Sequence, residues 1–189
     1  MLSNFHFVAT TPRELSPSVQ AFCRSLEPAA EPLWLEPTPA PFANVGQCYI
    51  NCHSLVESRG GEIQYGWMIW ELPDIYLTAE HHAIVRTSEG RLLDPTPQAT
   101  GEKLILFLPS ELAWNGTPII NRYCPLRDTP AVLRICQLQS RNLELFYQGR
   151  LGSREWATND AEAARLIRRF YEIKTKWEHE RKRRRKARR

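Results

Sequence analysis

The sequence predicts an α+β fold, in which an early helix packs on an antiparallel sheet and further helices follow towards the C-terminus. A helical pattern after residue 46 is followed by short segments rich in β-branched and aromatic residues, and these are followed by two amphipathic segments. The 189 residues suffice for one ordinary domain, and the apolar content of 42% is typical of globular proteins. We therefore expect most of the chain to fold around one core.

The N-terminal part is short of regular structure. A helix is predicted over residues 17–26, and the next twenty residues, 27–46, contain five prolines, which prevent a long helix. Because this stretch also carries Leu33, Trp34 and Phe42, we expect it to lie across the core as an extended arm.

A second helix begins at about Gln47 and ends at Gly60-Gly61, because Cys48, Cys52 and Leu55 recur at helical spacing. Strands are then predicted at four places, separated by turn residues. They lie at residues 63–72, 79–87, 90–96 and 103–109. A helix over 129–147 completes what we expect to be one domain, residues 1–150.

The C-terminal part has its own pattern. Residues 151–180 carry an apolar stripe at helical spacing, and Asn159 with Glu162 fits a capping pair near the start of this helix. Residues 181–189 contain eight basic residues and no acid, and we expect them to form a disordered, solvated tail. Without these eight, the chain has 17 basic against 21 acidic residues, so the positive net charge of +4 comes from the tail.

The tail could contact nucleic acid phosphates or an acidic protein through non-specific electrostatics, or it could simply be solvated. The eight residues concerned are Arg181, Lys182, Arg183, Arg184, Arg185, Lys186, Arg188 and Arg189. The rest of the sequence contains no motif of a sequence-specific nucleic-acid-binding domain.

Composition argues against some locations and site types. No apolar run approaches the roughly 18–20 residues that span a bilayer, and the first residues lack a secretory pattern, so we expect a cytoplasmic protein without a membrane partner. The five cysteines are odd in number and irregularly spaced, which favours reduced thiols over disulfides.

Cys48 is the best candidate for a reactive thiol. It falls in the first turn of the predicted helix, just after Gly46, where unpaired backbone N–H groups and the helix dipole stabilise a thiolate. Cys52 lies one turn further along, where burial favours the neutral thiol. We therefore expect Cys48 to be the reactive thiol and Cys52 to be a buried residue of the core.

A base and an orienting carboxylate follow in the sequence. His82 and its neighbour His81 lie on one predicted strand, and Asp94 lies on the next, twelve residues after His82. Successive side chains of a strand point to opposite faces, so only one of the two histidines can face the site. Asp94 can reach His82 across an antiparallel pair, as the orienting partner of a base does.

These residues resemble the transglutaminase-like branch of the papain-like fold, including a group of small uncharacterised bacterial proteins. The resemblance rests on Gly46-Gln47-Cys48, on His82-Ala83-Ile84-Val85 and on Asp94-Pro95-Thr96, and it covers about residues 44–97. It implies that His82, and not His81, is the base. It also implies a catalytic helix that carries the cysteine and packs on an antiparallel sheet.

The resemblance implies a cysteine-dependent acyl-transfer enzyme, such as an amidase, deamidase or peptidase, that acts through a thioester on a protein or peptide amide. Cys48 is the expected nucleophile, His82 the base and Asp94 the residue that orients the base. We expect the Cys48 backbone N–H to hold the oxyanion together with a side-chain amide of Gln47 or Asn44. Trp67 is a candidate for the wall of a substrate groove.

Other interpretations remain open. Cys48 could be an inert thiol, and the chain could be a catalytically silent papain-like domain that binds a partner, with the basic tail on nucleic acid or an acidic protein. A zinc site would draw on Cys48, Cys52, His53, His81 and His82, but the sequence has no C-x2-C pair, and neighbouring strand histidines point apart. We therefore expect neither a metal nor a cofactor.

Overall fold

The computed structural model describes residues 8–187 of the chain. These residues divide into two compact units, Val8–Leu126 and a second one that begins at Arg127. The helix over 130–147, which the sequence analysis placed in a domain of residues 1–150, falls in the same compact unit as the C-terminal helix. The first unit carries the candidate site.

The first unit combines helices with an antiparallel sheet, which confirms the α+β class. The six strands of its sheet are β1 (Leu33–Leu35), β2 (Glu62–Leu72), β3 (Tyr76–Arg86), β4 (Leu92–Leu93), β5 (Ile105–Pro109) and β6 (Arg122–Pro125). Their order is β1-β5-β2-β3-β4, and β6 also pairs with β3. β2, β3 and β5 were predicted from sequence, whereas β1 and β6 were not, because three or four residues are too few for a clear alternation.

β2 and β3 form the longest hairpin of the sheet, with Gly66 opposite His82 and Leu72 opposite Tyr76. β5 pairs with the other edge of β2, so β2 is a central strand, as its apolar residues on both faces predicted. A side chain at Gly66 would collide with the Leu108 carbonyl oxygen and would come within 2.5 Å of Phe107 Cζ. This glycine is therefore required for the close approach of β5.

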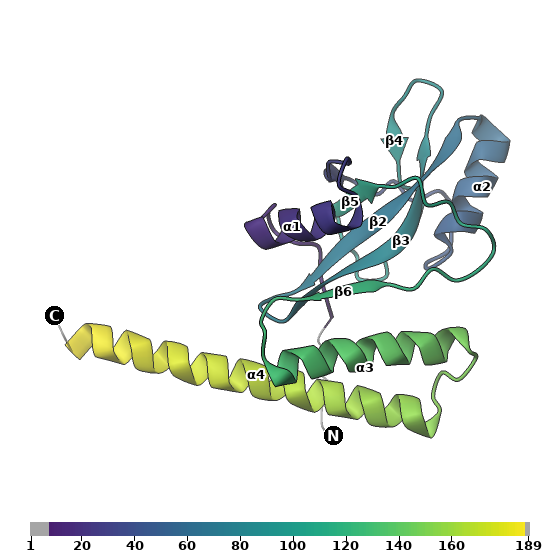
Figure 1. Cartoon of the computed structure of the whole chain (residues 1–189). Helices are drawn as coiled ribbons and strands as arrows, with labels where there is room; N and C mark the ends of the chain where they lie inside the picture. The colour runs from purple at the N-terminus through teal and green to yellow at the C-terminus, as the bar shows by residue number, and fades with distance from the viewer. Residues whose placement is uncertain (1–7, 188–189) are drawn as a thin grey trace. The chain divides into compact units, whose positions relative to one another are not determined.

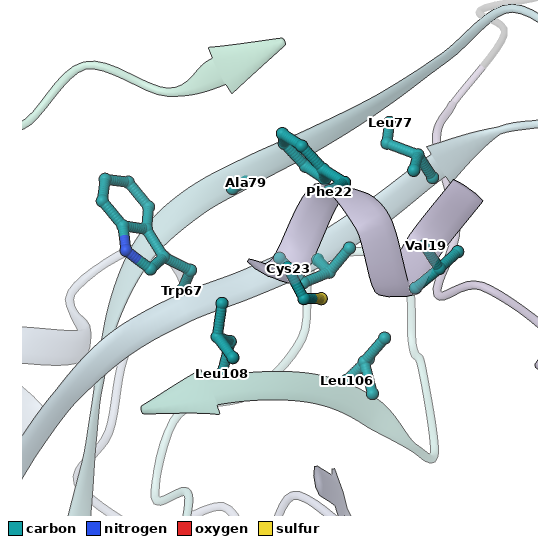
Figure 2. Packing of buried hydrophobic residues seen from close by; sticks show 9 residues of the cluster. Val19, Phe22, Cys23, Trp67, Leu77, Ala79, Leu106 and Leu108 are labelled. Atoms are coloured by element: carbon teal, nitrogen blue, oxygen red, sulfur yellow. The ribbon is translucent and has the colours of Figure 1, made fainter. Parts of the chain in front are cut away.

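Helix α1 (Pro17–Leu26) has the bounds that the sequence predicted. It begins after Ser16, whose side chain accepts a hydrogen bond from the Val19 N–H. Figure 2 shows the core that forms between α1 and the sheet. Its residues are Val19, Phe22, Cys23, Trp67, Ile69, Leu77, Ala79, Leu106 and Leu108.

Helix α2 (Cys48–Arg59) lies beside β3 (Figure 1) and follows a turn at Gly46, which has a φ of +73° that favours glycine. The helix ends before Gly60, as predicted. Cys52 and Leu55 pack against Ala83 and Val85 of β3. α2 and α1 therefore both contact side chains of odd-numbered residues of β3, at different ends of the strand.

The outer edge of β3 is paired with strands only at its two ends. β6 pairs with residues 76–79, and β4 pairs with residues 85–86. Within the described residues, positions 80–84 have no strand partner on that side. The first turn of α2 lies near this interval, because the Tyr49 hydroxyl is 3.4 Å from the His81 carbonyl oxygen.

The second unit is a pair of helices, α3 (Pro130–Tyr147) and α4 (Arg154–Ala187), which lie side by side in Figure 1. α4 begins after Ser153, whose side chain accepts from the Trp156 N–H, so the cap predicted at Asn159 is wrong. Both Arg134 nitrogens Nε and Nη2 donate to Glu162 of the facing helix, at 2.9 and 3.1 Å.

α4 continues beyond residue 180, where a disordered tail was expected, and is helical as far as Ala187. Alanine, arginine and lysine are good helix formers, so nothing in this composition ends the helix. Arg188 and Arg189 of the basic tail lie outside the described residues. No helix in residues 8–187 combines the length and the apolar character that a bilayer-crossing segment needs.

Candidate functional site

Cys48 is the first residue of α2, and it is 9% exposed. Its N-cap residue, Gln47, has no side chain hydrogen bond to the helix, and the first intrahelical bond is donated by the Asn51 N–H to the Gln47 carbonyl oxygen. The Cys48 N–H precedes that first bond, so no carbonyl of the same helix can satisfy it. The thiol therefore lies at the positive end of the helix dipole.

His82 lies next to Cys48 and is 3% exposed. Its Nε2 is 3.1 Å from Asp94 Oδ2. Because Nε2 is bonded to Asp94, Nδ1 is the ring nitrogen that remains for the Cys48 side chain, whose interaction with the ring raises the pKa of His82. The three side chains thus lie together in the order thiol, imidazole, carboxylate.

The charge on His82 is set by two opposing effects. Burial lowers its pKa, but the charge of Asp94, the hydrogen bond to Asp94 and the interaction with Cys48 all raise it. The three effects that raise the pKa of His82 together exceed the effect of burial, so this pKa lies well above its usual value near 6.5. The surroundings of His82 therefore favour the protonated form of its ring.

Asp94 is fully buried and accepts three hydrogen bonds. In addition to His82, the Thr96 N–H donates to Oδ1 at 2.9 Å, and Gln98 Nε2 donates to Oδ2 at 3.0 Å. The backbone of the proline-rich arm also reaches this segment, since the Thr38 N–H donates to the Asp94 carbonyl oxygen at 2.8 Å. Asp94 is thereby held in one orientation towards His82.

Asn51 connects the two sides of the site, although the sequence analysis did not select it. Its Oδ1 accepts from the Asn44 N–H, its Nδ2 donates to the Asn44 carbonyl oxygen, and Nδ2 also donates to Thr96 Oγ1. Asn51 is 2% exposed, so these bonds are shielded from water. A polar residue three positions after Cys48, on the buried face of α2, was the signal that could have revealed it.

His81 points to the other face of β3 and does not take part in this chain. Its Nδ1 accepts from the Tyr49 hydroxyl at 2.8 Å, and its Nε2 is 2.7 Å from the Leu112 carbonyl oxygen, which can only accept. Burial is the largest effect on the pKa of His81 and lowers it. His81 is therefore a neutral residue that links α2 to the loop after β5.

Cys52 differs from Cys48 in its surroundings. It is completely buried, and burial raises its pKa, with a further increase from the charges of Asp94 and Cys48. Its thiol stays protonated at neutral pH. Cys52 packs in the core of the helix–sheet contact, as the sequence suggested.

An open cavity of about 330 Å³ begins at Cys48 and His82. Its floor is formed by alternate residues of β2 and β3, and its walls come from the chain before α2, the segment after Asp94 and β6. The lining residues of the floor are Met68, Trp70, Tyr76, Thr78, Glu80 and His82. The cavity gives a substrate access to a thiol and an imidazole that are otherwise buried.

The residues expected to bind substrate are only partly where the sequence placed them. Gln47 is exposed and directly precedes Cys48. Asn44 contributes its backbone, because its N–H and carbonyl oxygen form hydrogen bonds with the Asn51 side chain. Trp67 does not line the cavity, because it is 3% exposed and packs under α1. The tryptophan that does line it is Trp70, which lies on the opposite face of β2.

No three His, Cys, Asp or Glu side chains among the described residues lie together in an arrangement that could hold a metal ion. Comparisons with models of protein families, with curated proteins and with solved structures find no match to this chain. The function must therefore be argued from the geometry of Cys48, His82 and Asp94.

Proposed function

We propose that this chain is a cysteine-dependent acyl-transfer enzyme, an amidase, deamidase or peptidase of papain-like or transglutaminase-like type. The observation that carries the proposal is that Cys48 and His82 line one open cavity and interact with each other, while His82 Nε2 is hydrogen-bonded to the buried Asp94. A nucleophile, a base and an orienting carboxylate in contact are the usual parts of such a site.

In the proposed reaction, the proton of the Cys48 thiol already resides on His82, and the thiolate sulfur forms a bond to an amide carbon. The C–N bond then breaks as His82 returns the proton to the leaving nitrogen, which yields a thioester and an amine or ammonia. Water then attacks the thioester and releases a carboxylic acid, which restores the thiol. Asp94 holds the imidazole throughout and stabilises its charged form.

The developing oxyanion needs donors near the sulfur. The Cys48 backbone N–H lies at the start of α2 and is the first such donor, and the exposed side chain of Gln47 is the second. The Asn44 side chain is a poorer candidate than Gln47, because its amide nitrogen is 3.5 Å from the Phe42 carbonyl oxygen and the loop is tied to Asn51.

Thiol labelling with iodoacetamide at pH 6 tests the proposal. If exposure decides the rate, Cys124 should react before Cys48, whereas activation by His82 predicts that Cys48 reacts first. Cys124 is more exposed than Cys48, but burial raises its pKa, and its thiol donates to the Pro125 carbonyl oxygen. Cys48 should react about tenfold or more faster than Cys124, since an ordinary thiol is less than about 1% ionised at pH 6.

The matched variants are His82→Ala and His53→Ala. His53 is an exposed histidine on α2, so His53→Ala controls for the loss of a histidine from the same region. His82→Ala should slow the labelling of Cys48 to the rate of Cys124, whereas His53→Ala should leave it unchanged. If Cys124 reacts first in the unmodified protein, Cys48 is not activated and the proposal is wrong.

A second candidate function rests on the C-terminal end of α4. Residues 181–186 are all basic and exposed, and the Arg181 guanidinium lies 5.4 Å from the ring centre of Trp177, which is 58% exposed. An exposed aromatic ring beside a row of cations suits single-stranded nucleic acid. In this alternative, the first unit is a catalytically silent papain-like domain.

Fluorescence anisotropy with a labelled single-stranded RNA tests this alternative. Deleting residues 181–189 should abolish binding, and the logarithm of the affinity should fall with that of the salt concentration with a slope of about −4 for six contacts. Binding that survives the deletion, or that ignores salt, would exclude this role. An acidic peptide serves as competitor and shows whether the surface prefers nucleic acid.

A further inference from the structure

The cavity next to Cys48 is built on one face of the β2–β3 hairpin. Gly66 pairs with His82, Met68 with Glu80, and Trp70 with Thr78. Because side chains alternate along a strand, these even-numbered residues share the face of His82, whereas Trp67 and Leu77 lie under α1. The floor of the cavity therefore continues along the strands away from the reactive pair.

The floor carries one negative charge. Among the described residues that line the cavity, Glu80 is the single acid, and none is lysine or arginine. Trp70 Nε1 donates to Glu80 Oε2 at 3.1 Å, which fixes the direction of the carboxylate. Oε1 makes no hydrogen bond within the described residues. The carboxylate is thus held by one oxygen and has the other available for a ligand.

A hydroxyl without a partner lies beside this carboxylate. Thr78 lines the cavity and is 6% exposed, and its Oγ1 has no hydrogen-bond partner within the described residues. A buried hydroxyl without a partner costs about 1–3 kcal/mol. Thr78 Oγ1 is thus an acceptor in the cavity that a ligand with several donors would satisfy.

The spacing of these groups matches one amino acid side chain. Glu80 lies two residues from His82 on β3, about 7 Å along the strand, and Thr78 lies about 13 Å away. Aromatic rings of Trp70, Tyr76 and Tyr123 line the same part of the cavity. Such rings favour an aliphatic stem and a cation at its end.

We infer that the groove selects a substrate with a lysine or arginine side chain in a residue that flanks the reacting carbonyl. The ammonium or guanidinium group binds the Glu80 carboxylate and donates to Thr78 Oγ1, and its aliphatic stem lies against Trp70. An ammonium has three donors and a guanidinium has five, so either can satisfy both oxygens. This inference rests on the proposed function, since it names the substrate class for the same site.

Two pairs of thiol-directed probes test the inference. In one pair, an iodoacetyl group is attached to the amino group of lysine amide or of norleucine amide. In the other, a chloromethyl ketone replaces the carboxyl group of N-blocked lysine or norleucine. The pairs place the side chain on opposite sides of the reactive carbon, and norleucine keeps the stem without the charge. The rate measured is that of alkylation at Cys48, with iodoacetamide as the reference without a side chain.

In at least one pair, the lysine probe should react about fivefold faster than the norleucine probe, as expected for an ion pair open to solvent. The preference should decrease in 1 M salt, because salt screens exposed charges. Glu80→Gln should reduce the ratio of lysine to norleucine rates to about one. Glu57→Gln removes the same charge from the exposed face of α2 and should leave the ratio unchanged.

Thr78→Val keeps the shape of the side chain and removes the hydroxyl. It should lower the lysine preference about twofold without lowering the urea midpoint of unfolding, because the lost hydroxyl had no partner. If Thr78→Val lowers that midpoint and leaves the preference intact, the hydroxyl serves folding and does not bind the substrate.

The outcomes separate this inference from the proposed function. Fast labelling of Cys48 by iodoacetamide without a lysine preference in either pair overturns the inference and leaves the proposed function standing. Slow labelling by every reagent overturns both. A lysine preference that persists in Glu80→Gln also overturns the inference, because another group must then recognise the cation.

Discussion

Replacing Asp94 by asparagine keeps the size of the side chain and removes its negative charge. Oδ1 of the new amide can still accept from the Thr96 N–H, which is 2.9 Å from the present oxygen. The amide nitrogen then faces His82 Nε2 and Gln98 Nε2, both of which now bond to Asp94 Oδ2. The His82 and Gln98 donors, which share the Asp94 Oδ2 acceptor in the unmodified protein, would then face an amide nitrogen that cannot accept from them.

The free energy of unfolding lost in Asp94→Asn can be estimated from the burial of the pair. Asp94 is fully buried and His82 is 3% exposed, so water cannot replace the lost interaction. Removing one partner of a buried charged pair typically costs about 3 kcal/mol or more. For a unit of this size, each kcal/mol corresponds to roughly 4 °C, so the melting temperature should fall by about 12 °C at pH 6.

The loss should depend on pH. Because Asp94 raises the pKa of His82 above 6.5, the stability from this pair is fully present below pH 6.5 and disappears as the pH rises through the pKa of the folded state. In Asp94→Asn, burial is opposed only by the interaction with Cys48, so the pKa of His82 should fall. The difference in unfolding free energy should therefore be largest near pH 6 and smaller at pH 9.

Urea unfolding of both proteins at pH 6, 7, 8 and 9 measures this difference, and the His82 ring signals followed by NMR give the pKa directly. The ring signals of His81 serve as a reference: burial mainly lowers its pKa, and this pKa should rise slightly in the variant, because the charge of His82 that also lowers it is lost. A difference that stays constant from pH 6 to 9, or a His82 pKa that does not fall in the variant, would refute the argument that Asp94 keeps His82 charged.

Three further substitutions test the support around the site and the second unit. Asn51→Leu removes three hydrogen bonds, so we expect a loss of about 3 kcal/mol in urea unfolding and slower alkylation of Cys48. Asn51→Asp should have the same effect, because it places a carboxylate oxygen against the Asn44 carbonyl oxygen, which needs a donor. Gly66→Ala forces β5 away from β2 and should cost about 2 kcal/mol or more, measured as a lower urea midpoint. Ser153→Ala removes the cap of α4 and should cost about 1 kcal/mol of helix stability by circular dichroism, whereas Ser153→Asp should retain it.

The bounds of several elements could be predicted from the sequence because local signals are strong there. Ser16-Pro17 starts α1, and Gly46 and Gly60 mark the ends of α2, so both helices occur as expected. The β-branched and aromatic residues of β2 and β3 predicted two strands, and the structure pairs them as a long hairpin. The weak points were the short strands β1 and β6, whose stability comes from their partners and not from their own residues.

The choice of Cys48 over Cys52 came from its place in the first turn of a helix. Alternation only places His81 and His82 on opposite faces, and the choice of His82 came from the resemblance to the transglutaminase-like branch. The structure brings Cys48 and His82 together with Asp94. The choice of Trp67 as a residue of the groove wall was wrong, and the cause is a limit of strand alternation. Alternation separates Trp67 from Trp70, but it does not say which face of β2 α1 covers.

The sequence by itself determined which residues lie on a common face, because helical and strand periodicity depend only on neighbours in the chain. Tertiary structure alone decided that Asn51 joins the loop before α2 to Thr96, and that Glu80 and Thr78 open into the cavity with His82. These contacts join segments tens of residues apart, and they depend on where α2 reaches the unpaired edge of β3. No local pattern carries that information, since it arises from the packing of whole elements.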